Sequence, residues 1–260
     1  MKLLLLLPPI AWFSASCNLE KLNDPIIIPV LDQEFTFDLW ENLAATNGTG
    51  LEIQISTTEL EDCLNSQILT EQTRTDQALN LRVYDILDPE VCDPGQAPAQ
   101  GGEMMHDLAP GTYHLNVDIQ DVVVNSGNLI ITPNYFRVEM DTQEGIRWVH
   151  EELRRVPANT LWGYITYETI DERTQALGIK NELAAMSGEL PLVDGYYGYF
   201  EVLNNDTQLV VKDMPPFNVL PFKFRYTGGD EELSSWLENA RASATGAIHI
   251  ILMDAAGREW

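Results

Sequence analysis

The residue types that could do chemistry are most concentrated between positions 162 and 201, where carboxylates lie among aromatic side chains. Glycosidases use paired carboxylates as general acid and base, and carbohydrate-binding surfaces stack sugars on aromatic rings. The residues of this candidate ligand platform are Trp162, Tyr164, Glu168, Tyr197, Tyr199 and Glu201. The alternative is cross-strand aromatic packing, which stabilises sheets by about 0.2 to 1 kcal/mol per pair. Since alternation along a strand turns neighbouring residues to opposite faces, packing is the favoured interpretation and a ligand platform is the second.

Catalysis by this group would require its carboxylates to converge in one cleft. The carboxylates concerned are Glu168, Asp171 and Glu201. Elsewhere, His150 opens a His-Glu-Glu-Leu-Arg stretch, but Arg154 stands where a zinc-binding helix needs its second histidine. His249 lies in an apolar run and is expected to be a hydrogen-bonded core residue. The chain has neither a Gly-x-Ser-x-Gly turn nor a glycine-rich phosphate loop before a helix. The sequence therefore predicts no catalytic residue, no metal site and no cofactor.

Residues 1–16 have the layout of an export signal, with Lys2 followed by an apolar stretch and the small residues Ser14, Ala15 and Ser16. The apolar stretch is too short for a membrane-spanning helix, which needs about 20 apolar residues. An ordinary signal peptidase would cut after Ala15 or Ser16 and leave a spare thiol at the next cysteine.

The Ser-Ala-Ser-Cys sequence that ends at Cys17 resembles the lipobox of bacterial lipoproteins, in the looser form found in Bacteroidota. The resemblance implies that the signal is removed, that Cys17 is acylated and that the protein is anchored in a membrane. Asn18 after the cysteine favours the outer membrane. Residues 17–30 are then a lipidated spacer before the fold.

Cys63 and Cys92 are the two cysteines that remain after Cys17. An even pair in an exported protein predicts a disulfide. Closing a loop of about 30 residues would stabilise the fold by roughly 3 to 4 kcal/mol. The alternatives are two free thiols or half of a metal site.

Apolar residues recur at every second position between residues 31 and 141, which is typical of half-buried strands. The clearest runs are 35–39, 51–55, 79–83 and 113–119. About seven short strands separated by turn residues predict an antiparallel β-sandwich. Residues 108–117 read Leu-Ala-Pro-Gly-Thr-Tyr-His-Leu-Asn-Val. This stretch resembles the turn and strand of extracellular bacterial Ig-like and transthyretin-like domains, and the resemblance implies an Ig-like fold.

A different pattern, with strands and helices in alternation, follows over residues 142–260. Apolar spacings of three and four predict an amphipathic helix over 144–156, ended by Pro157. Further helices are predicted over 171–186, with Asp171 as the cap, and over 230–241. Strands are predicted over 161–168, 222–226 and 247–253, with a hairpin over 195–212. The chain is thus predicted to be a multidomain β plus α+β protein, in which an antiparallel β-sandwich precedes a ferredoxin-like α+β sandwich.

The chain carries 40 acidic against 15 basic residues, a net charge of −25. Such a charge repels phosphate backbones, which excludes a nucleic-acid partner. Residues 18–141 alone hold a net charge of −18. The leading hypothesis is a non-enzymatic envelope lipoprotein in which the sandwich is a stalk and the α+β domain binds an envelope protein or a glycan. The alternatives are a lipoprotein hydrolase acting on glycan or peptide, and a structural subunit of a pilus or envelope assembly joined by strand exchange.

Overall fold

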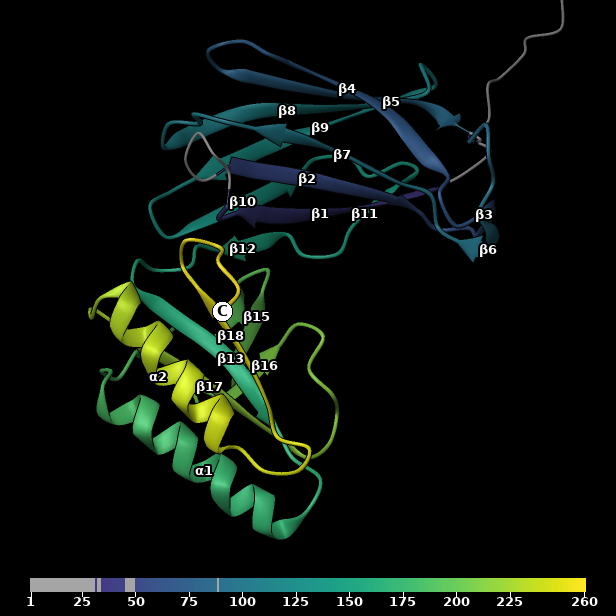
Figure 1. Ribbon diagram of the computed structural model, residues 1–260. Coiled ribbons are helices and arrows are strands. Elements are labelled where there is room, and N and C mark those ends of the chain that lie inside the picture. The colour runs from purple at the N-terminus through teal and green to yellow at the C-terminus, as the bar shows by residue number, and fades with distance from the viewer. Residues whose placement is uncertain (1–30, 32–33, 45–49, 88) are drawn as a thin grey trace, which may run out of the picture. The chain divides into compact units, whose positions relative to one another are not determined.

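The structure is a computed structural model that describes residues 31, 34–44, 50–87 and 89–260. The predicted signal peptide, Cys17 and the spacer lie outside the described residues. Within them the fold is mostly β-sheet, with eighteen strands and two helices (Figure 1). Residues 31–260 form a single unit.

Ten strands form one large sheet around a single apolar core. These strands are β1 (Phe35–Asn42), β2 (Gly50–Thr57), β4 (Gln67–Arg74), β5 (Ala78–Leu87), β7 (Gln100–Met105), β8 (Gly111–Ile119), β9 (Val123–Ile131), β10 (Tyr135–Met140), β11 (Ile146–Trp148) and β12 (Glu152–Arg154). Their order in the sheet is β11-β1-β2-β7-β4-β5-β8-β9-β10-β12. All ten contribute buried side chains to one cluster, so the period-two runs predicted from the sequence are confirmed as strands with one face inward.

The helix predicted over 144–156 is wrong, because this segment forms the short strands β11 and β12. β11 pairs in parallel with β1, and β12 pairs antiparallel with β10. Between them, the Val149 amide donates to the Phe37 carbonyl and the Glu151 carbonyl accepts from the Val138 amide, each at 2.8 Å. Residues 146–154 therefore pair with strands near both ends of the sheet order, and the large sheet curves around its core.

Residues 146–148 also have the spacing of a strand, in which every second side chain is buried, and this spacing explains why the segment is extended. Ile146 and Trp148 are both buried, and the Trp148 ring packs against Phe37 with centroids 5.4 Å apart. Val149, which a helix would have buried, is exposed. Tertiary pairing with β1 thus overrides the local helical pattern, and the large sheet extends past the predicted boundary at 141 to Arg154.

The disulfide predicted between Cys63 and Cys92 is confirmed. It lies beside a small two-stranded sheet of β3 (Glu61–Cys63) and β6 (Pro94–Ala97). The covalent link therefore holds a loop region that contributes little to the large core.

A second sheet is built on β13 (Thr160–Thr166), which pairs antiparallel with β17 (Val219–Arg225) on one side and β18 (His249–Asp254) on the other. Helices α1 (Ile170–Ala185) and α2 (Asp230–Ser243) lie side by side on one face of this sheet (Figure 1). Their buried residues join those of the three strands in one cluster. The opposite face of the sheet packs against β15 (Phe200–Leu203) and β16 (Gln208–Val211), which β14 (Gly195–Tyr196) extends to three strands. The strands and helices predicted after residue 160 are confirmed in type, except that the predicted hairpin over 195–212 is a three-stranded sheet, because its first strand is divided into β14 and β15.

Two details of this region differ from prediction. Asp171 is not the cap of α1, because Thr169 is the N-cap and Glu172 completes a capping box with it. His249 is not a core residue, because it is exposed at the start of β18, where alternation buries Ile250 instead.

Glu172 also joins α1 to the chain before β18. Its carboxylate accepts from the amides of Ala247 at 3.0 Å, Glu168 at 2.8 Å and Thr169 at 2.9 Å. These three hydrogen bonds lower the pKa of the Glu172 carboxyl from its usual 4.5, and the bond from Ala247 has the largest effect.

Replacing Glu172 by Gln should destabilise the protein at neutral pH, because an amide has one accepting oxygen where the carboxylate has two. A lowered folded pKa means that the carboxylate's contribution is complete above the ordinary pKa and is lost as the pH falls through the folded value. The melting temperatures of wild type and Glu172→Gln should therefore differ at neutral pH and converge as the pH falls through the lowered pKa of Glu172. Glu182→Gln, at an exposed position of the same helix, is the matched control. Equal melting temperatures at neutral pH would contradict the role of Glu172.

Candidate functional site

The aromatic residues of the predicted platform lie mainly in a packed cluster. Trp162 is 0% exposed and Tyr197 is 4% exposed. Phe200 packs against both, with ring centroids 5.4 Å from Trp162 and 4.9 Å from Tyr197. Trp162 and Tyr197 therefore stabilise the face of β13 opposite the helices, and both rings are almost entirely removed from solvent.

The carboxylates predicted to converge in a hydrolase cleft lie on two sides of the second sheet. Glu168 and Asp171 are exposed at the start of α1, on the helical side. Glu201 is half-buried in β15, which packs on the opposite side. Tyr164 is half-buried, and its hydroxyl lies 3.5 Å from the Asp213 carbonyl. The structure thus does not bring the predicted acid and base together.

Tyr199 is the platform residue that reaches the large sheet. Its ring packs on Trp40 of β1 with centroids 4.5 Å apart. Its hydroxyl donates to the Glu41 carbonyl at 3.0 Å and accepts from the Leu43 amide at 3.4 Å. Tyr199 therefore fixes the end of β1 against the hairpin β15–β16.

A buried ion pair reinforces the same junction. Glu41 is the last residue of β1 that faces inward, and it is 1% exposed. Arg155 Nε donates to Glu41 Oε1 at 2.7 Å, and the Val156 amide lies 3.4 Å from Oε2. Because a carboxylate out of contact with water must be paired, Glu41 holds the chain leaving β12 at the end of β1.

A polar hollow opens beside this junction on the outer face of the large sheet. Register places Asp38 of β1, Gln54 of β2 and Gly102 of β7 in one row across three strands. Gly102 has no side chain, and a Cβ there would lie 2.7 Å from the Ile53 carbonyl oxygen. A cavity of about 450 Å³ lies beside this row and is bounded on β7 by Gln100 and Gly101; we call it the β1–β2–β7 hollow. Its polar side chains include Thr36, Asp38, Glu52, Gln54, Ser56 and Lys212.

Lys212, which follows β16, contributes a positive charge to this acidic hollow from the C-terminal part of the chain. Its Nζ lies 4.2 Å from the centre of the Trp40 ring, a cation–π distance. The hollow is therefore shared between the large sheet and the C-terminal part, and it combines carboxylate, amide, hydroxyl and ammonium groups beside an aromatic ring.

Asp38 also binds a histidine at the edge of the hollow. Its carboxylate oxygens lie 3.0 and 3.1 Å from His150 Nδ1, and the His150 ring stacks on Tyr196 with centroids 3.6 Å apart. Burial raises the pKa of Asp38, although the charge of His150 opposes this shift. Burial and the nearby Asp38 charge also raise the pKa of Tyr196. The three side chains form a packed polar contact between β1 and β14.

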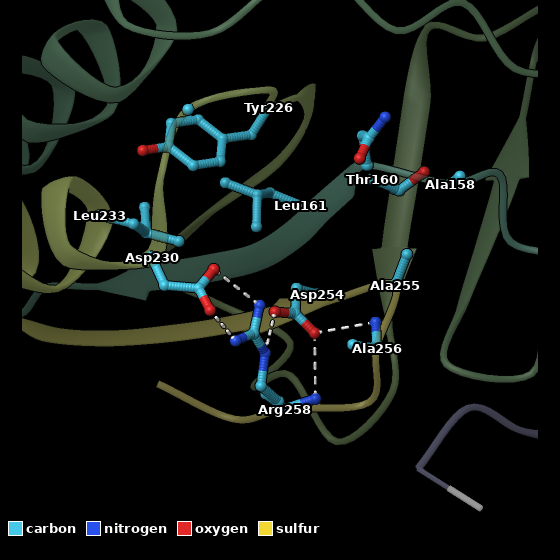
Figure 2. A pocket seen from close by; sticks show the side chains of 12 residues that line it. Ala158, Thr160, Leu161, Tyr226, Asp230, Leu233, Asp254, Ala255, Ala256 and Arg258 are labelled. Atoms are coloured by element: carbon cyan, nitrogen blue, oxygen red, sulfur yellow. Dashed lines mark hydrogen bonds and ion pairs between the residues drawn. The ribbon is translucent and has the colours of Figure 1, made fainter. Parts of the chain in front are cut away.

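A second cavity, of about 260 Å³, lies between the start of β13, the start of α2 and the segment after β18 (Figure 2). Arg258 spans it, with Nε 2.7 Å from Asp254 Oδ2 and Nη2 3.0 Å from Asp230 Oδ1. Arg258 holds the pKa of Asp230 below its usual range, chiefly by hydrogen bonding. Since these charges are paired with one another and hold the segment after β18 to α2, the β1–β2–β7 hollow is the stronger candidate for a ligand site.

The described residues contain no group of three or more His, Cys, Asp or Glu side chains arranged to hold a metal ion. Neither α1 nor α2 has the length and apolar character needed to cross a membrane.

The residues of the hollow were only partly foreseeable. Asp38, Glu52 and Gln54 occupy the polar positions of the alternating strands, which is a signal that the sequence carries. Trp40 and Lys212 are 172 residues apart, and only the tertiary fold brings them together.

In comparisons with known proteins, the chain matches no protein-family model, no curated protein and no solved structure.

The Glu41–Arg155 pair can be tested by removing its buried charge. Glu41→Gln should lower the free energy of unfolding by about 2 to 4 kcal/mol, because the buried side chain then no longer carries the charge that attracts Arg155. Glu34→Gln, at an exposed position just before β1, is the matched control and should change it by less than about 0.5 kcal/mol. Chemical denaturation measures both, and an equally small effect of the two substitutions would contradict a structural role for the pair.

Proposed function

We propose that this chain is a non-enzymatic outer-membrane lipoprotein that binds a neutral glycan in the β1–β2–β7 hollow. The observation that carries the proposal is the neighbouring pair Asp38 and Gln54, which lines the same cavity as Lys212. Ligand sites favour concave positions between parts of a fold, where a few polar groups converge. The hollow has both properties.

The chemistry of the hollow suits a hydroxyl-rich ligand. Carboxylate and amide oxygens accept from sugar hydroxyls, while Gln54 and Lys212 can donate to them. Trp40 supplies a neighbouring aromatic ring, although Lys212 and Tyr199 already contact it. The net charge of −25 repels anionic polysaccharides, which makes a neutral glycan the better match.

A hydrolase is the less favoured alternative. Its predicted carboxylates, Glu168 and Asp171 on one side and Glu201 on the other, are separated by the second sheet. Asp38 and His150 are a second acid–base pair, but the His150 ring is stacked on Tyr196, and the contact serves packing between β1 and β14.

We also propose finer fold assignments for the two parts. Pairing between β4 and β7 at a single position divides the large sheet into two layers, which supports an Ig-like β-sandwich. The order β18-β13-β17, with α1 after β13 and α2 after β17, supports a variant of the ferredoxin-like α+β sandwich.

Glycan binding is tested by a glycan array probed with the full chain, followed by calorimetric titration with the best neutral oligosaccharide. Gln54→Ala and Lys212→Met should each weaken binding at least tenfold without changing the melting temperature, since both side chains line the hollow. Gln77→Ala, in the exposed turn between β4 and β5, is the matched control. No array signal, or equal affinity in all variants, would contradict the proposal.

Anchoring is tested by metabolic labelling with an alkyne fatty acid in a bacterial host that processes lipoproteins. The wild-type chain should incorporate the label and fractionate with the outer membrane, because Cys17 is the proposed acylation site. Cys17→Ser should incorporate none and be released. A labelled Cys17→Ser protein, or an unlabelled wild type, would refute the anchor.

A further inference from the structure

The large sheet has a fork where β4 and β7 separate. These two strands pair in parallel at Gln67 and Gln100 alone, although β7 pairs along its other edge with β2 and β4 pairs along its other edge with β5. The register of β4 against β5 shifts between Leu69 and Thr70, where the pairing passes over Tyr84 of β5. This irregularity in the β4–β5 pair lies close to the point where β4 and β7 separate.

The pairing of β7 with β2 determines which backbone groups of β7 face the fork. Ala99 bonds toward β2, whereas the Gln100 amide donates to the Ser66 carbonyl on the side of β4 at 3.3 Å. In an antiparallel pair, successive residues bond to opposite sides, so the amide of Met104 also turns toward the fork. β7 therefore presents backbone hydrogen-bonding groups where its parallel neighbour has diverged.

Two side-chain contacts cross the fork in place of strand pairing. Thr70 Oγ1 donates to Glu103 Oε1 at 2.7 Å. Arg74 donates to the carbonyls of His106 and Asp107 at 3.0 and 3.2 Å. Both contacts are made by flexible side chains, so an added strand can replace them without disturbing the core.

A cavity of about 410 Å³ lies at the base of the fork and supplies independent evidence for a ligand. Ser66 lines this cavity, is 4% exposed, and its hydroxyl has no hydrogen-bond partner. A buried hydroxyl without a partner is costly, which favours an occupant that satisfies it. Gly101 and Gly102 line the same cavity without side chains, and Leu64, which is 54% exposed, adds an apolar wall.

We propose that the fork between β4 and β7 accepts an extended, basic peptide segment of a partner protein as an added strand. An extended backbone offers donors and acceptors at the spacing of β7, and its side chains can contact Leu64. A basic segment matches Glu103 at the fork and the net charge of −18 on residues 18–141. The same charge disfavours a second copy of this chain as the occupant. This site is distinct in function from the glycan hollow, and it provides the open strand edge that an envelope assembly requires.

The probe is a ten-residue peptide of alternating valine and lysine, blocked at both ends, added to the full chain and followed by fluorescence anisotropy. An alternating valine and glutamate peptide is the charge control and should bind at least tenfold more weakly. Met104→Pro removes the amide that faces the fork and keeps the bonds of β7 to β2. It should bind the lysine peptide at least tenfold more weakly than Met104→Ala, which retains the amide.

Two measurements keep the proposal testable if Met104→Pro fails to fold. Amide exchange at Met104 should slow at least tenfold when the lysine peptide is added, and Ser66→Ala should weaken peptide binding. Equal binding of the two peptides, unchanged exchange at Met104 or equal affinity in Ser66→Ala would overturn the proposal. Protection of Met104 that rises with protein concentration alone would overturn the assignment to a partner protein and identify a second copy as the occupant.

Discussion

A carboxylate buried at the end of β1 is the constraint on which the rest of the arrangement depends. Glu41 must be paired once it is removed from water, and Arg155 reaches it only if the chain leaving β12 passes the end of β1. That path requires the segment from Ile146 to Arg154 to run between the two ends of the sheet. The same contact, with Tyr199 beside it, sets Trp40 and Lys212 in place around the hollow. One ion pair thus links the closure of the large sheet to the geometry of the candidate site.

The two glycines of β7 explain why both proposed sites lie on the same strand. Gly102 lies beside Gln54 in the row that starts at Asp38, and a Cβ at this position would meet the Ile53 carbonyl, while Gly101 lines the hollow itself. Gly101 lets the backbone of β4 approach at the base of the fork, where a Cβ would lie 2.8 Å from the Ile68 carbonyl oxygen. A strand interior with two glycines is weak in itself, so the surrounding pairing and the closed sheet must hold it. The acidity of the chain then selects among ligands, since it favours neutral glycans and basic peptides over anionic ones.

Local periodicity predicted most of the elements, and it failed where tertiary pairing decides. The alternation around Phe35, Leu51 and Tyr113 specified strands because one face had to be buried. The segment 144–156 fits both a helical and an extended spacing, and its pairing with β1 selects the extended form. Trp162 and Tyr197, named from the sequence as candidate platform residues with packing as the favoured interpretation, are both buried in one aromatic cluster. The contact of Lys212 with Trp40 leaves no local trace in the sequence, so the shared character of the hollow could not be predicted from it.

The proposed ligand site is the β1–β2–β7 hollow, to which both parts of the chain contribute side chains. The most direct measurement is a map of amide chemical shifts during titration of the full chain with its best neutral oligosaccharide. We expect the largest changes at Asp38, Gln54 and Lys212, which belong to both parts. Changes confined to α1 and α2, or to the cavity spanned by Arg258, would contradict it.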